Sequence, residues 1–322
     1  MAEATMASKP AETASNKTPE IDPRVRSVSR ARTQDHIATG ILWGIAICII
    51  VLVIATIGYI VLSGIGKAVD PSFLFGKPEQ FKAGGGIGPE LFNSFYLLIL
   101  TLLISLPISL GGAIFLTQYA PPGRFTNIAK TAIETLSSLP SIVVGLFGML
   151  FFVLRFGWGF SILSGALALT MFNIPILVRT IQQAIEQVPR DQRDAAVALG
   201  LTRWEATCNI LLPRAMPAII TGTIISAGRV FGEAAALIYT AGQSAPALNW
   251  AAPIWSKANP LNVMRPAETL AVHIWKINSE GVVPDLAVVS AGTAAVLMIC
   301  ILLFNLLARV VGRALTRKMT AE

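Results

Sequence analysis

Long apolar runs recur along this chain, and they constrain its fold more than any other feature. Each run is long enough to cross a hydrocarbon core of about 30 Å as a helix. Within a bilayer only helices and closed barrels satisfy every backbone polar group, and unbroken runs of this length are typical of helices. We therefore predict an all-α, polytopic membrane protein with six transmembrane helices, at Thr39–Leu62, Leu91–Tyr119, Glu134–Leu154, Phe160–Val178, Ala218–Ala241 and Pro284–Ala308.

The composition agrees with a lipid environment. Hydrophobic residues make up 54% of the 322 residues and charged residues make up 13%, whereas soluble domains usually carry about 25% charged residues. The three cysteines form no Cys-x-x-Cys pair, and the only histidines, His36 and His273, are far apart in the chain. We therefore expect neither a disulfide framework nor a metal site.

The Lys and Arg residues are distributed unevenly between the two sides of the predicted membrane. If the N-terminus is cytoplasmic, 17 of the 25 lie on the cytoplasmic side, 7 lie outside and Arg229 lies within a span. Cytoplasmic segments of membrane proteins are enriched in Lys and Arg, so we expect both termini in the cytoplasm. The same distribution explains the net charge of +7 through contact with membrane lipid, without a nucleic acid partner.

The connection between the fourth and fifth spans has the pattern of two short helices. Pro189 suits a first helical turn, and Gly200 suits the left-handed residue that ends a helix. Thr202 and Glu205 have the spacing of a capping box, which predicts the start of a second helix. We expect Pro213 to end that helix. An amphipathic hairpin that lies on the membrane without a partner remains an alternative.

This connection resembles the EAA loop of ABC importer permeases. Asp194 stands where that family usually has Glu, so the charge is kept but the reach is one methylene shorter. The resemblance implies a coupling helix seated in a cleft of a separate ATPase subunit. The chain has no GxxxxGK[ST] phosphate-binding loop, so it is expected not to be an enzyme and to hold no cofactor, with ATP and magnesium on the partner. The matching residues are Asp194, Ala195, Ala196, Gly200, Ile210, Leu212 and Pro213.

Three charged residues are candidates for a substrate path. Arg229 and Glu233 are four residues apart, which predicts that they share one face of the fifth span. They either neutralise each other, or Arg229 offers a bidentate guanidinium to an oxyanion while Glu233 orients it. Arg179, at the cytoplasmic end of the fourth span, either faces the exit of the anion or reaches lipid phosphates.

Two further polar residues in predicted spans have simpler interpretations. Glu134 is expected to begin the third span and to compensate the helix dipole. Asn173 is expected to hydrogen-bond backbone groups that Pro175 frees at a helix kink.

From about Leu91 to Ala308 the chain resembles the permeases of phosphate importers, most closely the PstA-type subunit. The resemblance rests on SLPSIVVGLFG, GRVFGEAAAL and PAETLAVHIWKINSEG, which begin at Ser138, Gly228 and Pro266. It implies a type I ABC importer transmembrane domain in a bacterial cytoplasmic membrane. The implied partners are a second, PstC-type permease, two copies of an ATP-binding subunit and an extracytoplasmic phosphate-binding protein. Alternatives are a permease for another oxyanion such as molybdate or sulfate, or a non-transporting membrane scaffold or phosphate sensor.

These expectations divide the chain into four parts. They are a disordered cytoplasmic tail at 1–35, a first transmembrane helix with an outer loop at 36–90, a permease domain at 91–310 that contains the coupling loop 189–213, and a basic cytoplasmic tail at 311–322.

Overall fold

The computed structural model describes residues 23–79, 83–244, 246–280 and 284–320, and every regular element in these ranges is a helix. The chain divides into two compact units, residues 1–56 and 57–322. Helix α1 (Pro23–Ala68) runs from the first unit into the second, and all other helices belong to the second.

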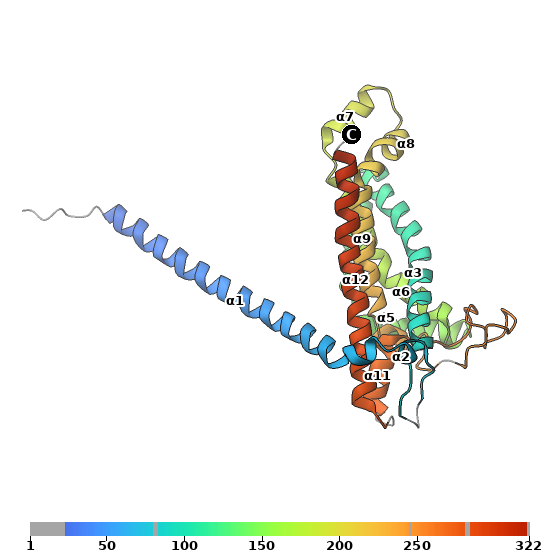
Figure 1. Cartoon of the computed structure of the whole chain (residues 1–322). Coiled ribbons are helices and arrows are strands. Elements are labelled where there is room, and N and C mark those ends of the chain that lie inside the picture. Colours follow the sequence, from blue (N-terminus) through green and yellow to red (C-terminus); the bar gives the residue numbers. More distant parts are fainter. Residues whose placement is uncertain (1–22, 80–82, 245, 281–283, 321–322) are drawn as a thin grey trace, which may run out of the picture. The chain divides into compact units, whose positions relative to one another are not determined.

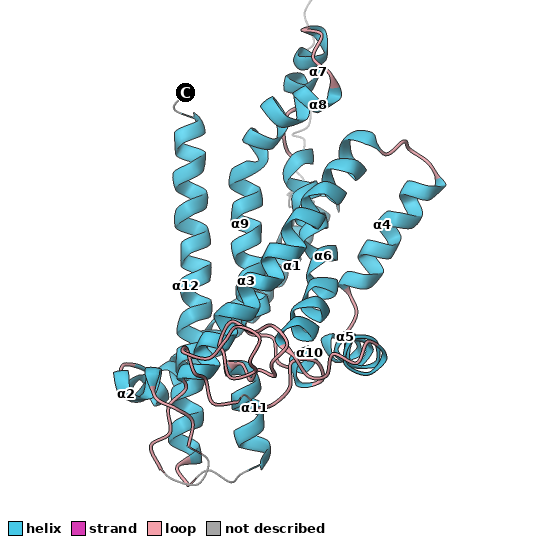
Figure 2. Cartoon of the chain, turned by 90° about the vertical axis from the view of Figure 1, so that its right-hand side faces the viewer, coloured by secondary structure: helices cyan, strands magenta, loops and turns pink. Residues whose placement is uncertain are grey.

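The second unit is a bundle of long helices with short helices at its two ends (Figures 1 and 2). Its helices are α2 (Pro71–Phe75), α3 (Gly88–Ile114), α4 (Arg124–Ser137), α5 (Ser141–Gly148), α6 (Ile162–Glu186), α7 (Arg190–Ala198), α8 (Arg203–Ala206), α9 (Leu212–Phe231), α10 (Ala235–Ile238), α11 (Leu270–Glu280) and α12 (Leu286–Thr320). Three π-helical segments continue α3, α5 and α8, at Phe115–Tyr119, Met149–Arg155 and Thr207–Leu211.

Five helices are long and apolar enough to cross a membrane, and a bent pair of helices makes a sixth if it counts as one span. The prediction of an all-α polytopic membrane protein is therefore confirmed. The five straight spans are Gln34–Ala68, Gly88–Tyr119, Ile162–Glu186, Arg203–Phe231 and Leu286–Arg317, and the bent pair is Arg124–Ser137 with Ser141–Arg155.

The predicted third span is not one straight helix. The chain bends by 98° between α4 and α5, because Pro140 has extended backbone angles and lacks the N–H that a continuing helix needs. Glu134 does not begin this span as predicted: it is exposed and lies near the end of α4.

The predicted fifth span is also wrong at both ends. Its helix begins earlier in the chain than predicted, because α8 and α9 form one continuous stretch, Arg203–Phe231. It stops at Phe231, where Gly232 caps it, and the chain resumes as the short helix α10. Glycine has low helix propensity, which suits a break at this position.

Asn173 joins the three central helices of the bundle. Its side-chain nitrogen on α6 donates to the Ser105 hydroxyl on α3 at 3.0 Å, and its side-chain oxygen accepts from the Ser226 hydroxyl on α9. Asn173 therefore pairs with side chains, and the prediction that it serves freed backbone groups is wrong. The Ser109 hydroxyl instead donates to the Ile174 carbonyl, at 3.3 Å, next to Pro175. These buried polar contacts set the register of α3, α6 and α9.

Helices extend into both predicted tails. Residues 1–22 of the predicted N-terminal tail lie outside the described residues, and helix α1 already begins at Pro23, a residue that suits a first helical turn. Helix α12 runs to Thr320, through almost all of the predicted basic tail.

A buried arginine fixes the long connection between α10 and α11. Arg265 has no exposed surface, and it donates to the Asn93 side-chain oxygen on α3 at 2.6 Å and to the Pro260 carbonyl at 3.0 and 3.1 Å. Burial lowers the pKa of Arg265 to about 10, so the guanidinium remains charged at neutral pH. The connection is thus anchored to the bundle by hydrogen bonds.

Candidate coupling hairpin and anion path

The connection between α6 and α9 folds into the predicted pair of short helices. Gly200 ends α7 with φ +78°, and the Leu201 N–H donates to the Ala196 carbonyl at 3.1 Å, as in a Schellman cap. At the start of α8 the Thr202 hydroxyl accepts from the Glu205 N–H, and the Glu205 carboxylate accepts from the Thr202 N–H at 2.8 Å. The predicted glycine stop and capping box are confirmed. We call residues 189–213 the coupling hairpin.

Pro213 does not end the second helix of the hairpin, and that prediction is wrong. The π-helical segment Thr207–Leu211 precedes it, with the Leu212 N–H donating to the Thr207 carbonyl. This wider turn places Pro213 in the first turn of α9, where its missing N–H is tolerated. The second helix of the hairpin therefore continues into α9 without a break.

The seven residues that resemble the EAA loop occupy two different environments. Ala196 is buried, and Ile210 and Leu212 are half-buried beneath the hairpin. The other four, Asp194, Ala195, Gly200 and Pro213, are exposed. The motif thus contributes both the internal packing of the hairpin and part of its outer surface.

Two large apolar side chains project from the same hairpin. Leu199 is 79% exposed and Trp204 is 58% exposed, and both flank the turn between α7 and α8, at one end of the second unit (Figure 1). Exposed apolar groups beside a polar surface favour contact with another protein. The EAA-loop resemblance does not include Leu199, and its position directly before the helix-ending glycine was the available signal for this residue.

Arg229 is exposed on α9, within a membrane span. Its guanidinium carbon lies 4.5 Å from the centre of the Phe172 ring, and it has no acidic partner among the described residues. An arginine within a bilayer is costly unless it faces a partner, water or an anion. Arg229 is therefore positioned to meet a group that lies outside this chain.

Glu233 does not share a helical face with Arg229, because α9 ends between them. The Glu233 carboxylate instead accepts a hydrogen bond from the Ala236 N–H, at 3.4 Å, in the first turn of α10. The two residues remain close in sequence, but the expected i, i+4 arrangement is absent.

A cavity of about 910 Å³ opens between α6, α9 and α12. Thr221 and Ile225 line it from α9, and Arg229 lies one helical turn beyond Ile225 on the same helix. Arg179 is exposed on α6 but is absent from the lining. The lining contains no acidic residue, and its basic residues are Arg214, Arg309, Arg313 and Arg317.

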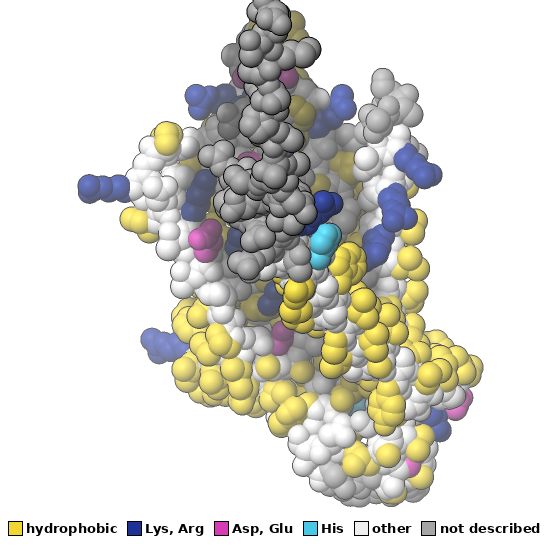
Figure 3. Space-filling model, turned by 90° about the vertical axis from the view of Figure 1, so that its left-hand side faces the viewer, with side chains coloured by type: hydrophobic (Ala, Val, Ile, Leu, Met, Phe, Trp, Pro, Cys, Tyr) yellow, Lys and Arg dark blue, Asp and Glu magenta, His cyan; other side chains and the backbone are white. Residues whose placement is uncertain are grey.

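In the sequence these four arginines indicated only the membrane orientation. Their spacing on α12, at Arg309, Arg313 and Arg317, is four residues, which places three cations along one helix face. That spacing was the signal for a cationic surface on α12. The cavity itself also needs walls from α6 and α9, which only tertiary packing provides. On the face of the second unit that Figure 3 shows, most Lys and Arg side chains lie in the half nearer α7 and α8.

Comparison with protein families matches residues 109–321 to the family described as binding-protein-dependent transport system inner membrane component. The chain is 47% identical over 291 residues to the "Probable ABC transporter permease protein YqgI" of Bacillus subtilis, covering 89% of this chain and 98% of the relative. It is 35% identical over 236 residues to "Phosphate transport system permease protein PstA 2" of Mycobacterium tuberculosis, covering 73% of this chain and 77% of the relative.

A further relative and two solved structures complete the comparison. The "Probable ABC transporter permease protein YqgH" of Bacillus subtilis is 35% identical over 159 residues, covering 47% of this chain. A bacterial ABC transporter that imports alginate has a TM-score of 0.55 at 16% identity, covering 88% of this chain and 98% of that one. The MetNI methionine ABC transporter, in an inward-facing conformation, has a TM-score of 0.52 at 17% identity, covering 71% of this chain and 94% of that one. These structures show that the chain has the fold of an ABC importer transmembrane domain.

Proposed function

Because this chain belongs to the family of binding-protein-dependent transport system inner membrane components, we propose that it carries inorganic phosphate inward through the cytoplasmic membrane of a bacterium. The chain is a permease subunit of a binding-protein-dependent ABC importer and a multi-pass inner membrane protein. The ATPase of such an importer lies on partner subunits, and the permease itself carries no cofactor. Our proposal adds the cargo, the path and the way in which force reaches that path.

One observation carries the proposed path: Arg229 continues the α9 face that lines a cationic cavity. Arg229 is exposed within a span and unpaired with any described acid. One turn away, Ile225 begins a cavity whose charged lining consists of four arginines. A row of guanidinium groups suits a multiply charged oxyanion, which accepts bidentate hydrogen bonds from each. We propose that phosphate passes Arg229 and leaves through this cavity.

Force would reach the path through the coupling hairpin. Two ATP-binding subunits would hold the hairpins of this chain and of a second, PstC-type permease, with Leu199 and Trp204 seated against the ATPase. Closure of the ATPases on ATP would move α8, and the continuous stretch Arg203–Phe231 would carry that movement to Arg229. The residues proposed for this coupling are Asp194, Ala195, Ala196, Gly200, Ile210, Leu212 and Pro213.

The proposed orientation places both termini and the coupling hairpin in the cytoplasm. The connection between α10 and α11 then faces outward and presents Trp250 and Trp255, of which Trp255 is 84% exposed. Because Arg265 anchors this connection, it offers a preformed surface on which an extracytoplasmic phosphate-binding protein can dock.

Phosphate is favoured over other oxyanions by the relatives named as phosphate permeases, which are about one third identical to this chain. Competition tests this choice. In cells whose phosphate uptake depends on this chain, excess arsenate is expected to block uptake, while excess sulfate or molybdate leaves it unchanged. Inhibition by sulfate or molybdate but not by arsenate would reassign the cargo.

Replacing Arg229 by glutamine tests the path. Loss of charged hydrogen bonds worth about 1.5–3 kcal/mol is expected to lower phosphate uptake by roughly 10- to 100-fold. Arg124→Gln is the matched control, since Arg124 is an exposed arginine at the start of α4, away from the cavity. Uptake by Arg229→Gln that equals the wild type would remove Arg229 from the mechanism.

A non-transporting scaffold or phosphate sensor is the remaining alternative. A transporter is expected to co-purify with an ATP-binding subunit in mild detergent, and phosphate uptake should require that subunit. Purification without any ATPase, together with unchanged uptake in cells lacking it, would favour the alternative.

A further inference from the structure

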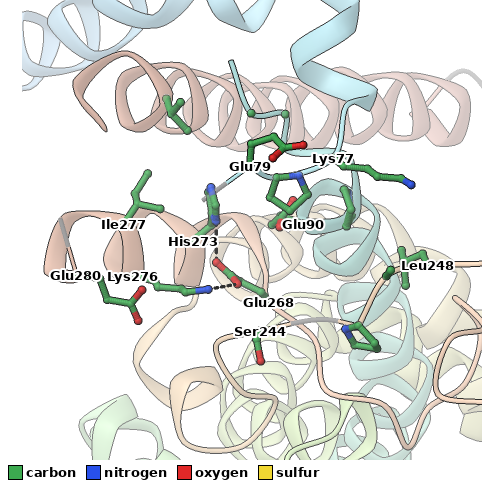
Figure 4. A pocket seen from close by; sticks show the side chains of 17 residues that line it. Lys77, Glu79, Glu90, Ser244, Leu248, Glu268, His273, Lys276, Ile277 and Glu280 are labelled. Atoms are coloured by element: carbon green, nitrogen blue, oxygen red, sulfur yellow. Dashed lines mark hydrogen bonds and ion pairs between the residues drawn. The ribbon is translucent and has the colours of Figure 1, made fainter. Parts of the chain in front are cut away.

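A second cavity, of about 480 Å³, lies at the end of the second unit opposite α7 and α8, where α11 meets the start of α3 (Figures 1 and 4). Its walls come from the segment before α3, the segment after α10, and one face of α11. Nothing in the proposed coupling or phosphate path uses it.

The charges of this cavity favour a cation. Its acidic lining residues are Glu79, Glu90, Glu268 and Glu280, and its basic lining residues are Lys77, Lys276 and the titratable His273. Four carboxyl groups therefore face two ammonium groups and one imidazole. This balance is the opposite of that in the arginine-lined cavity, so phosphate is a poor fit here.

The side chain of Glu268 contacts those of His273 and Lys276 in the interior of the protein. The Glu268 carboxylate contacts His273 Nδ1 at 2.7 Å and the Lys276 ammonium at 3.1 Å (Figure 4). Glu268 and His273 are buried, and Lys276 is nearly so. Glu268 lies just before α11, and the other two lie on successive turns of it.

Glu90 adds an unpartnered carboxylate oxygen to this group. It is 2% exposed, and its Oε2 has no hydrogen-bond partner among the described residues, although it lines the cavity. One ligand atom from each of Glu90, Glu268 and His273 lies within 4.8 Å of the other two. A buried carboxyl group with an unpartnered oxygen is unfavourable, and either a proton or a further cation would supply the missing partner.

We propose that Glu90, Glu268 and His273 bind one divalent metal ion of the zinc type. One imidazole with two carboxylates is a donor set that zinc accepts, at metal–ligand distances of roughly 2.0–2.2 Å. The imidazole favours zinc over calcium or magnesium, which prefer oxygen ligands alone. The three side chains come from α3, from the segment just before α11 and from α11 itself, and one ligand atom of each lies within 4.8 Å of the other two. The bound ion would fasten α11 to the start of α3.

Lys276 would compete with the metal. Its ammonium pairs with one oxygen of the Glu268 carboxylate, so Lys276 and a divalent ion would compete for the same carboxylate. Removal of the ammonium should therefore strengthen metal binding, whereas removal of a ligand should weaken it. These opposite effects on metal affinity distinguish a metal site from a purely structural ion-pair cluster.

Zinc titration of the purified full chain tests the proposal. The background variant carries serine at Cys48, Cys208 and Cys300, which removes thiolate ligands. After treatment with a chelator, calorimetry with Zn²⁺ is expected to give one equivalent per chain. Glu90→Gln and His273→Gln should each weaken binding by about tenfold or more, while Lys276→Met should tighten it several-fold.

Glu280→Gln is the matched control, since Glu280 lines the same cavity outside the proposed ligand set. The zinc affinity of this variant should equal that of the background variant. X-ray absorption at the zinc edge should show a nitrogen and oxygen shell only. Failure of the background variant to bind one equivalent would overturn the proposal, as would weaker zinc binding by Lys276→Met. If Glu90→Gln does not fold, the change in zinc affinity caused by Lys276→Met still decides between a metal site and an ion-pair cluster.

Discussion

At the scale of single residues, Gly145 is the point of closest contact between two short helices that bend into the bundle. A Cβ atom at this position would lie 2.7 Å from the Ala236 Cα and 3.1 Å from the Ala236 carbonyl oxygen. These are backbone atoms that cannot rotate away. The strings SLPSIVVGLFG and GRVFGEAAAL, which are far apart in the sequence, therefore meet through α5 and α10.

Gly145→Ala is expected to destabilise the fold by about 1–3 kcal/mol, because the added methyl group forces α5 and α10 apart. The measurement is thermal unfolding of the purified chain in detergent. Gly111→Ala is the matched control: Gly111 is also a helical glycine, but nothing lies within 4 Å of its added Cβ. The control should be neutral or stabilising, by up to about 1 kcal/mol. Equal melting temperatures for the two variants would contradict this packing.

The same scale shows which site residues the sequence could predict. Thr202, Glu205 and Gly200 act through neighbours three to five residues away, so their roles followed from spacing alone. Arg229 was found because a charge within an apolar run is conspicuous. The ligand set around Glu90 was missed, because Glu90 and Glu268 meet only through the packing of α3 against α11. Counting the histidines in the sequence does not reveal carboxylates that come from distant segments of the chain.

At the scale of helices, the coupling that we propose for the hairpin requires a rigid short helix α8. That helix has four residues, too few to be stable alone, so its cap and its π-helical continuation into α9 hold it. A loose α8 would absorb the movement of an ATPase instead of passing it to the membrane span.

Thr202→Val removes the capping hydroxyl and is expected to cost α8 about 1 kcal/mol. In proteoliposomes that contain the complete importer, we expect fewer phosphate ions transported per ATP hydrolysed. Thr202→Ser is the matched control, because it retains the hydroxyl that accepts from the Glu205 N–H. If the two variants show the same transport per ATP, the cap has no part in coupling.

Hydropathy located the helices but not their breaks. The chain stays apolar through the bend at Pro140 and through Gly232, so each stretch was predicted as one straight span. Pro140 was a usable signal that the sequence analysis did not weigh. The stop at Gly232 had a weaker signal, since other helical glycines, such as Gly228, lie within α9. Whether a helix breaks at such a glycine depends on which neighbouring helix packs against it, so the break is set by tertiary packing.

At the scale of the whole molecule, one face of α9 has no cover from the described part of this chain. Ile225 is 53% exposed and borders the arginine-lined cavity, and Arg229 is exposed one turn further along. A cavity open along one helix of a single permease becomes a closed path when a second permease covers it. YqgH, the second Bacillus subtilis permease similar to this chain, is the kind of protein expected to do so.

Disulfide cross-linking in the membrane tests whether this face meets a different permease. Ile225→Cys, in a variant with serine at the three natural cysteines, is expected to cross-link to cysteines placed on the corresponding helix of a PstC-type partner. Val296→Cys is the matched control, because Val296 is buried in the core of this chain and should form no cross-link. A cross-link between two copies of this chain instead would make the importer a homodimer of permeases. The two arginine-lined cavities would then face each other across a symmetry axis, and the path would belong equally to both copies.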